Sequence, residues 1–165
     1  MTARRAIVYA VLLVVAVSLW HFTHSERAQI KRVFADVERL AAKEPGESVM
    51  ECAAKSRSLA SHFKDGCTIL DLRHGLKTTY SRDDIAGGLL AFRSGATKIA
   101  VVFHELEISV EGGEARVDGW IDYSGTEASW PWCEPKSEKF LAHLEKIDGQ
   151  WLVSRIKTVV GLNHG

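Results

Sequence analysis

Residues 103–117 read FHELEISVEGGEARV, and this stretch decides the fold. Apolar and polar side chains alternate on both sides of Gly112-Gly113, the pattern of two antiparallel strands joined by a two-residue turn. With the glycines at the turn, the register places one set of pairs on a single face: Val110 with Ala115, Ile108 with Val117, Leu106 with Gly119, His104 with Ile121, and Val102 with Tyr123. Because these pairs are almost all apolar, we expect this face to point inward, with His104 on it.

A second hairpin is expected around the turn Asp148-Gly149. Its register pairs Leu144 with Val153, Ala142 with Arg155, and Leu141 with Ile156. Both faces are partly apolar, so this pair belongs in the centre of the sheet and its inner face stays open. Residues 127–134 form the connecting loop between the two hairpins.

Helices and short strands are expected before the hairpins. The first helix carries an apolar stripe with helical spacing: Ile30, Val33, Phe34, Val37, Leu40 and Ala41. After Pro45-Gly46 a second helix, about 48–63, presents Val49, Ala53, Leu59 and Phe63. Strands 67–73 and 76–80 follow, and Ser81 with two acids behind it predicts the start of a third helix. The element order predicts an α+β fold.

This order, together with the segments 80–85, 103–117 and 144–155, resembles the nuclear transport factor 2-like, or SnoaL-like, superfamily. The resemblance covers residues 26–160. It implies three helices packed on a curved, mainly antiparallel sheet, a cystatin-like cone that encloses a pocket. Members of this superfamily include isomerases, cyclases, dehydratases, transport adaptors and domains without known activity, so the resemblance implies a fold rather than a reaction.

The N-terminus predicts a membrane anchor. Residues 6–22 contain no charged side chain, Arg4 and Arg5 precede them, and Trp20 lies near their far end. Seventeen residues are the lower limit for a helix that spans a bilayer. The arginines predict that residues 1–5 are cytoplasmic and that the rest lies outside, in a bacterial inner membrane with the domain on the periplasmic or extracellular side. A cleaved signal peptide and a buried core helix remain alternatives.

Charge and motifs exclude several function classes. The chain has 21 basic and 21 acidic side chains, which argues against a nucleic-acid partner. No spacing typical of a metal site occurs, and neither a GxGxxG nor a Walker pattern is present. The sequence therefore predicts no metal and no cofactor.

Four polar residues are candidates for a pocket inside the cone: Asp71, His104, Tyr123 and Arg155. His104 is either an acid-base group or a core histidine hydrogen-bonded to Tyr123, and the second reading predicts that His104→Ala clearly lowers the melting temperature. Asp71 is either a buried base or an exposed partner of Arg73. Arg155 either binds an acidic ligand or forms a salt bridge on the sheet surface.

Three cysteines bear on a disulfide: Cys52, Cys67 and Cys133. An intact second helix holds Cys52 and Cys67 about 16 Å apart, too far for a bond. Any disulfide should therefore join Cys133 to Cys52 or to Cys67, and three free thiols are the alternative.

The resemblance implies that an enzyme of this superfamily would place a carboxylate base and a tyrosine or second acid inside the cone. The first helix carries no tyrosine and the chain has no convincing carboxylate pair, which favours a non-catalytic role. We expect a single-pass membrane protein that displays its cone domain for protein–protein contact or self-association, as a homodimer or as an accessory subunit of a membrane complex. The alternative is a small-molecule-binding or isomerase-like enzyme that uses the cone pocket.

Overall fold

The computed structural model describes residues 9, 11–14, 25–72, 75–126 and 136–159. The ordered elements are α2 (Glu26–Ala41), α3 (Val49–Ala60), β1 (Phe63–Asp71), β2 (Leu76–Tyr80), α4 (Arg82–Gly95), β3 (Ile99–Glu111), β4 (Glu114–Gly125), β5 (Lys136–Ile147) and β6 (Gln150–Val159). The six strands form one sheet in the order β2-β1-β6-β5-β4-β3, in which β1 and β6 are parallel and all other neighbours antiparallel. The predicted α+β class, with three helices and a curved, mainly antiparallel sheet, is confirmed.

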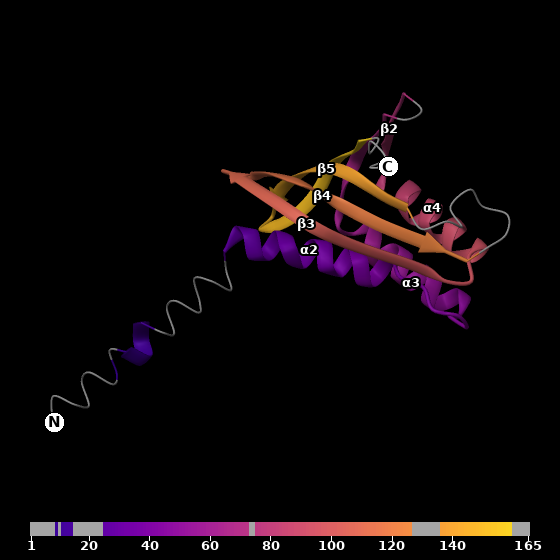
Figure 1. Ribbon diagram of the computed structural model, residues 1–165, viewed down its shortest axis with the longest axis horizontal. Helices are drawn as coiled ribbons and strands as arrows, with labels where there is room; N and C mark the ends of the chain where they lie inside the picture. Colours follow the sequence, from indigo (N-terminus) through magenta and orange to yellow (C-terminus); the bar gives the residue numbers. More distant parts are fainter. Residues whose placement is uncertain (1–8, 10, 15–24, 73–74, 127–135, 160–165) are drawn as a thin grey trace.

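Serine side chains define the starts of all three helices. Ser25 accepts a hydrogen bond from the backbone N–H of Ala28, and Ser48 and Ser81 form capping boxes with Glu51 and Asp84. These contacts satisfy amide groups that have no partner within the helix. Figure 1 shows α2 running lengthwise along the sheet beneath β3, with α3 and α4 gathered near its far end.

The core lies between the helices and one face of the sheet. Ile30 and Phe34 on α2 are buried against Val117 on β4 and against Phe140 and Leu144 on β5. Three phenylalanines fill its centre, with ring centroids 5.2 Å apart for Phe34–Phe103, 5.7 Å for Phe34–Phe140 and 5.4 Å for Phe103–Phe140. The stripe predicted on the first helix is confirmed.

The face predicted for the second helix is correct at Leu59 and wrong at Val49. Its buried residues are Cys52, Ser56, Leu59 and Ala60, whereas Val49 is 78% exposed. Phe63 is buried as the first residue of β1 rather than as the end of the helix. Val49 is the first residue of α3, outside the packed part of the helix, and α3 ends at Ala60, so Phe63 belongs to the following strand.

A β-bulge in β3 changes the predicted register. Ile108 pairs with Val117 and Val110 with Ala115, as predicted near the turn. Between His104 and Glu107 the register shifts by one residue, and Glu105 has a positive φ of 54°. His104 therefore pairs with Trp120, and Phe103 takes the place opposite Ile121. A shift of one residue turns side chains to the other face. The prediction that His104 lies on the apolar face is wrong.

A second bulge lies in β6. Leu144 pairs with Val153 as predicted, but the next pairs are His143 with Arg155 and Ala142 with Ile156. Ser154 is the extra residue, and its hydroxyl donates to the carbonyl of His143. The predicted pairing of Ala142 with Arg155 is wrong for this reason, and Ala142, Leu144 and Val153 define the inner face that the sequence left open.

None of the helices in the described ranges is long and apolar enough to cross a membrane. Most of the segment 6–22 lies outside those ranges.

Candidate functional site

The structure distributes the four predicted pocket residues over both faces of the sheet. Side chains at every second position of β1 share a face, so Asp71 lies on the same face as Cys67 and Ile69. Cys67 is fully buried in the core, and this face is therefore the helix-facing side. Tyr123 shares that side with Phe103 and Ile121. His104 and Arg155 lie on the opposite, outer side, where they pair with Trp120 and His143. The four residues therefore do not converge on one pocket.

Asp71 and Tyr123 lie on the same face but on separate strands. Strands β6 and β5 lie between β1, which carries Asp71, and β4, which carries Tyr123. The row of Asp71 runs through Thr158 and Phe140 to Gly119, and Tyr123 lies four residues farther along β4. At the usual strand spacing and rise per residue the two backbones are therefore roughly 19 Å apart along a flat sheet, so the register does not bring these two residues together.

His104 lies beside Asp122 on the outer face of the sheet. Its Nε2 atom lies 3.0 Å from Oδ1 of Asp122, and the two side chains are 39% and 51% exposed. A hydrogen bond from Ser137 and the contact with His104 lower the pKa of Asp122. The Nε2 atom is itself buried, and its geometry with Asp122 does not meet that of a hydrogen bond. His104 is therefore neither a core histidine nor a group inside the cone.

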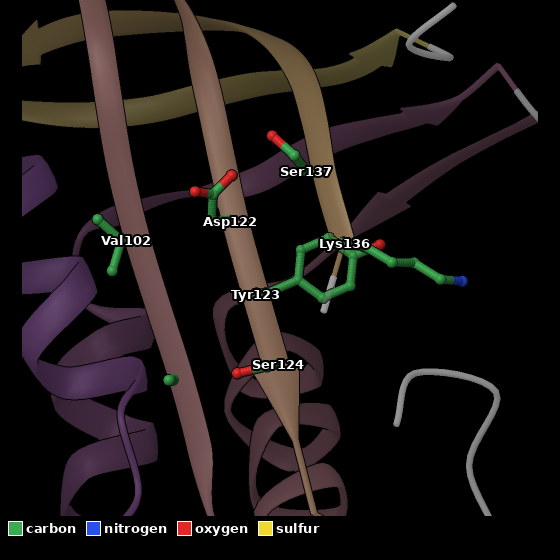
Figure 2. A pocket seen from close by; sticks show the side chains of 7 residues that line it. Val102, Asp122, Tyr123, Ser124, Lys136 and Ser137 are labelled. Atoms are coloured by element: carbon green, nitrogen blue, oxygen red, sulfur yellow. The ribbon is translucent and has the colours of Figure 1, made fainter. Parts of the chain in front are cut away.

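An open groove lies next to this pair, at the ends of β3, β4 and β5. Figure 2 shows Asp122 on β4 beside Ser137 on β5, with Val102 on the neighbouring strand β3. Its volume is about 300 Å³, and its lining mixes apolar and polar groups: Ala100, Val102, Asp122, Tyr123, Ser124, Lys136 and Ser137. Val102, near the start of β3, is 47% exposed and gives the groove an apolar wall. An apolar side chain beside hydrogen-bonding groups is the kind of surface that another protein chain can cover.

Arg155 is exposed on the outer face, close enough to Glu145 to contribute to lowering the pKa of that carboxyl. The larger cause is a hydrogen bond from Lys64, whose Nζ lies 2.6 Å from Oε2 of Glu145. This agrees with the reading of Arg155 as a surface charge.

The sequence did not reveal a buried charged cluster between the helices. The guanidinium of Arg93 on α4 is 3% exposed and donates to the carbonyl oxygens of Leu40, Ala41 and Ala42 and to Oε2 of Glu47. These are the carbonyl groups at the end of α2 that have no partner within the helix. Lys43 donates in return to the carbonyls of Arg93 and Ala96. Because an arginine in the last turn of a helix is usually solvated, no signal in the sequence marks this one as buried.

Oε2 of Glu47 accepts hydrogen bonds from Arg93 and from the thiol of Cys52, and Oε1 forms an ion pair with Lys55. Burial raises the pKa of its carboxyl, but the contacts with Lys55 and Arg93 outweigh burial and lower the pKa. These contacts tie the end of α2 to α3 and α4, although Nε of Arg93 is buried without a hydrogen-bond partner.

The two described cysteines are buried and are not joined to each other. Burial raises the pKa of the Cys67 thiol to about 11, which makes Cys67 a poor nucleophile. Cys133, the expected disulfide partner, lies outside the described residues, so that pairing stays a prediction. Within the described residues, no three His, Cys, Asp or Glu side chains are grouped so that they could hold a metal ion.

No protein-family model and no curated protein matches the chain. Solved structures do match. A provisionally named scytalone dehydratase from Novosphingobium aromaticivorans superposes with a TM-score of 0.65 at 16% identity, over 83% of this chain and 85% of that one. A nuclear transport factor 2-like protein with a cystatin-like fold from the same organism superposes with a TM-score of 0.61 at 13% identity. The match covers 93% of this chain and 90% of that one.

A provisionally named calcium/calmodulin-dependent protein kinase II association domain from Xanthomonas campestris gives a TM-score of 0.62 at 12% identity, over 87% of this chain and 92% of that one. Such low identities establish the fold alone. The chain has the cystatin-like fold of nuclear transport factor 2-like proteins, and its function must be argued from its own residues.

Proposed function

We propose that this chain is a single-pass membrane protein whose cone domain is a non-catalytic association module. The observation that carries the proposal is the divergence of the four polar candidates, because acid-base chemistry needs its groups within hydrogen-bond reach of one substrate. His104 and Arg155 point away from the cone, and Phe34, Phe103 and Phe140 occupy the middle of its described interior.

The outer face of β3, β4 and β5 is the surface through which we propose that the module associates. Val102 is 47% exposed there, and Trp120 is half-buried beside it on β4. Aromatic side chains are enriched in protein interfaces. The partner is a second copy of this chain, and an accessory role in a larger membrane complex is compatible with the same surface.

A matched pair of substitutions tests the surface. Val102→Asp places a charge on the outer face, whereas Val49→Asp places one on α3, where the side chain is 78% exposed. The mass of the purified full-length chain, in mild detergent, is measured over rising concentration by light scattering. We expect the native chain and Val49→Asp to form dimers and Val102→Asp to be shifted towards monomers. A native chain that is monomeric at every concentration would overturn the proposal.

The membrane part of the proposal rests on residues 1–22: Arg4 and Arg5 before an uncharged run that ends near Trp20. The two arginines support a cytoplasmic N-terminus, with the domain on the periplasmic or extracellular side of a bacterial inner membrane. Reporter enzymes fused to the C-terminus test this orientation. A reporter that is active only in the cytoplasm would reverse it.

A second candidate function is binding or isomerisation of a small molecule inside the cone. It is favoured by Asp71 and Tyr123 on the concave face and by the similarity to a provisionally named scytalone dehydratase. A thermal-shift screen with small aromatic and polycyclic ketones separates the two functions. A ketone that raises the melting temperature of the native chain, but not that of Tyr123→Phe or Asp71→Asn, would favour the small-molecule function.

A further inference from the structure

The two edges of the sheet differ in how they are covered. The order of the strands places β3 at one edge and β2 at the other. On the edge of β3, the backbone N–H of Phe103 donates to Oε2 of Glu38 on α2, at 3.0 Å. Nearer the start of the strand, Ile99 and Lys43 exchange backbone hydrogen bonds of 2.9 and 3.0 Å. A further strand can pair with β3 only if these contacts break.

The edge of β2 has no such cover. Within the described residues, β2 pairs with β1 alone. Its side chains are exposed except for that of Tyr80, and Leu76 is 60% exposed. Figure 1 shows β2 on the side of the sheet away from α2. The backbone N–H and C=O groups that an edge strand turns away from its neighbour can pair with an added strand.

Three basic side chains lie on the outer face beside this edge. Lys157 on β6 and Lys77 on β2 both pair with Leu70 on β1, one from each side. Arg155 lies in the next row, and both Arg155 and Lys77 are exposed. In the described part of β6, β1 and β2, no carboxylate lies in either row. A strand added to β2 would therefore meet Lys77 at the end of a band of positive charge.

The inner face of β2 is less polar. Tyr80 pairs with the buried Cys67, so Tyr80 shares the helix-facing side with Thr78 and Leu76, which alternate with it. Every second residue of an added strand would meet this face, and Leu76 and Tyr80 offer apolar contacts there. The two faces of β2 therefore ask for different side chains.

We propose that β2 accepts an extended segment of another protein in which acidic residues alternate with apolar ones. The main chain of that segment pairs with β2, its carboxylates lie on the outer face beside Lys77, and its apolar side chains lie against Leu76 and Tyr80. This edge is separate from the face of β3, β4 and β5 proposed for self-association. It gives the domain a second, different partner and does not depend on the first.

The charge of the edge also argues against a second copy as the occupant. A lysine on a short edge strand is a common protection against pairing between identical edges. Pairing of two β2 strands would bring two basic bands together at one joint. A carboxylate beside Lys77 instead makes a favourable cross-strand pair. The edge therefore selects an acidic strand.

Three labelled peptides test this chemistry on the purified full-length chain in mild detergent, by fluorescence anisotropy. The first alternates valine with glutamate and should bind. The second alternates valine with lysine and should not bind. The third is the glutamate peptide with proline in place of its central valine, and its dissociation constant should be about tenfold higher or more, because proline removes a main-chain donor and breaks the strand.

Charge reversal on the chain tests the position of the site. Lys77→Glu should raise the dissociation constant of the glutamate peptide about threefold or more, since an attractive cross-strand pair becomes repulsive. Lys31→Glu, on the exposed side of α2, is the matched control and should bind this peptide like the native chain. Val102→Asp should also bind it normally, so this test is independent of self-association.

Hydrogen exchange measured by mass spectrometry locates the contact. The glutamate peptide should slow exchange in residues 76–80 and leave residues 99–111 unchanged. Failure of this peptide to bind, equal binding of the lysine peptide, or an unchanged affinity in Lys77→Glu would overturn the proposal. Slow exchange of residues 76–80 that appears without peptide as the chain is concentrated would assign the edge to a second copy, and would overturn it as well.

Discussion

At the scale of single residues, the position of His104 decides whether the cone contains an acid-base group. Alternation from the turn places it among apolar residues, and the bulge at Glu105 moves it to the outer face beside Asp122. Nothing in the sequence marks Glu105, because a glutamate is not the residue expected at a positive φ. The turn itself and the pairs next to it were predictable, since Gly112-Gly113 is a strong hairpin signal.

The changed position of His104 changes the expected effect of removing it. His104→Ala should lower the free energy of unfolding by less than about 1 kcal/mol, because partly exposed ion pairs are weak. The small effect expected here differs from the prediction made for a core histidine, in which His104→Ala clearly lowers the melting temperature. Urea unfolding at pH 7 measures the difference, and a loss of several kcal/mol would show that the side chain is buried after all.

Gly119 lies opposite the bulge and is required by close packing. A Cβ atom there would lie 2.7 Å from Cδ2 of Leu106, 3.2 Å from the carbonyl oxygen of His104 and 3.2 Å from Cε1 of Phe140. Gly119→Ala should therefore cost about 1–3 kcal/mol of stability. Gly87→Ala in α4 is the matched control, since nothing lies within 4 Å of its Cβ position. The control should be neutral or stabilising, by up to about 1 kcal/mol. Equal thermal stability of the two variants would contradict the packing described for Gly119.

At the scale of elements, Arg93 joins three helices. Arg93→Met removes the donors for the carbonyls of Leu40, Ala41 and Ala42 and leaves Glu47 without one of its cations. We expect a loss of about 3–5 kcal/mol, the usual cost of breaking a buried pair from one side. Arg39→Met is the control, because Arg39 is 69% exposed in its pair with Asp36 and should cost less than about 1 kcal/mol. Similar melting temperatures for the two variants would refute the role assigned to Arg93.

The same cluster predicts how stability depends on pH. The folded state lowers the pKa of Glu47 below its ordinary value of 4.5. Its ionised form therefore adds stability above pH 4.5, and this contribution is lost as the pH falls through the lowered pKa. The stability difference between the native chain and Glu47→Gln should shrink as the pH is lowered from 5 to 3. Chemical denaturation at several pH values measures it, and a difference that stays constant would show that Glu47 is not the titrating group.

The elements themselves were largely predictable, and their faces were less so. Strand 76–80 and the helix start at Ser81 were correct, because capping and turn residues act locally. The sequence did not predict the buried face of α3 or the register beyond each bulge. Both depend on contacts with distant strands. The bulge at Ser154 is an example: its hydroxyl bonds to a neighbouring strand rather than to its own.

At the scale of the whole molecule, no helix of the described ranges covers the outer face of the sheet. The helices pack on the side of Phe103 and Phe140, and the other side carries Val102, Trp120 and His104. The fold class followed from element order and patterning, whereas the function of this face depends on which residues the bulge in β3 turns outward. The sequence alone could not predict which residues share this face, because that requires the register of all the strands.

The most direct measurement is photo-cross-linking in the native membrane. A photoreactive amino acid replaces Trp120, at the centre of the proposed contact, and in a parallel sample it replaces Val49 on α3. We predict a cross-linked product of twice the chain's mass, containing two copies of this chain, from position 120 and not from position 49. The result that would contradict the proposed function is only uncross-linked chain from position 120, with the chain present at normal levels in the membrane. The domain would then not associate through its outer face.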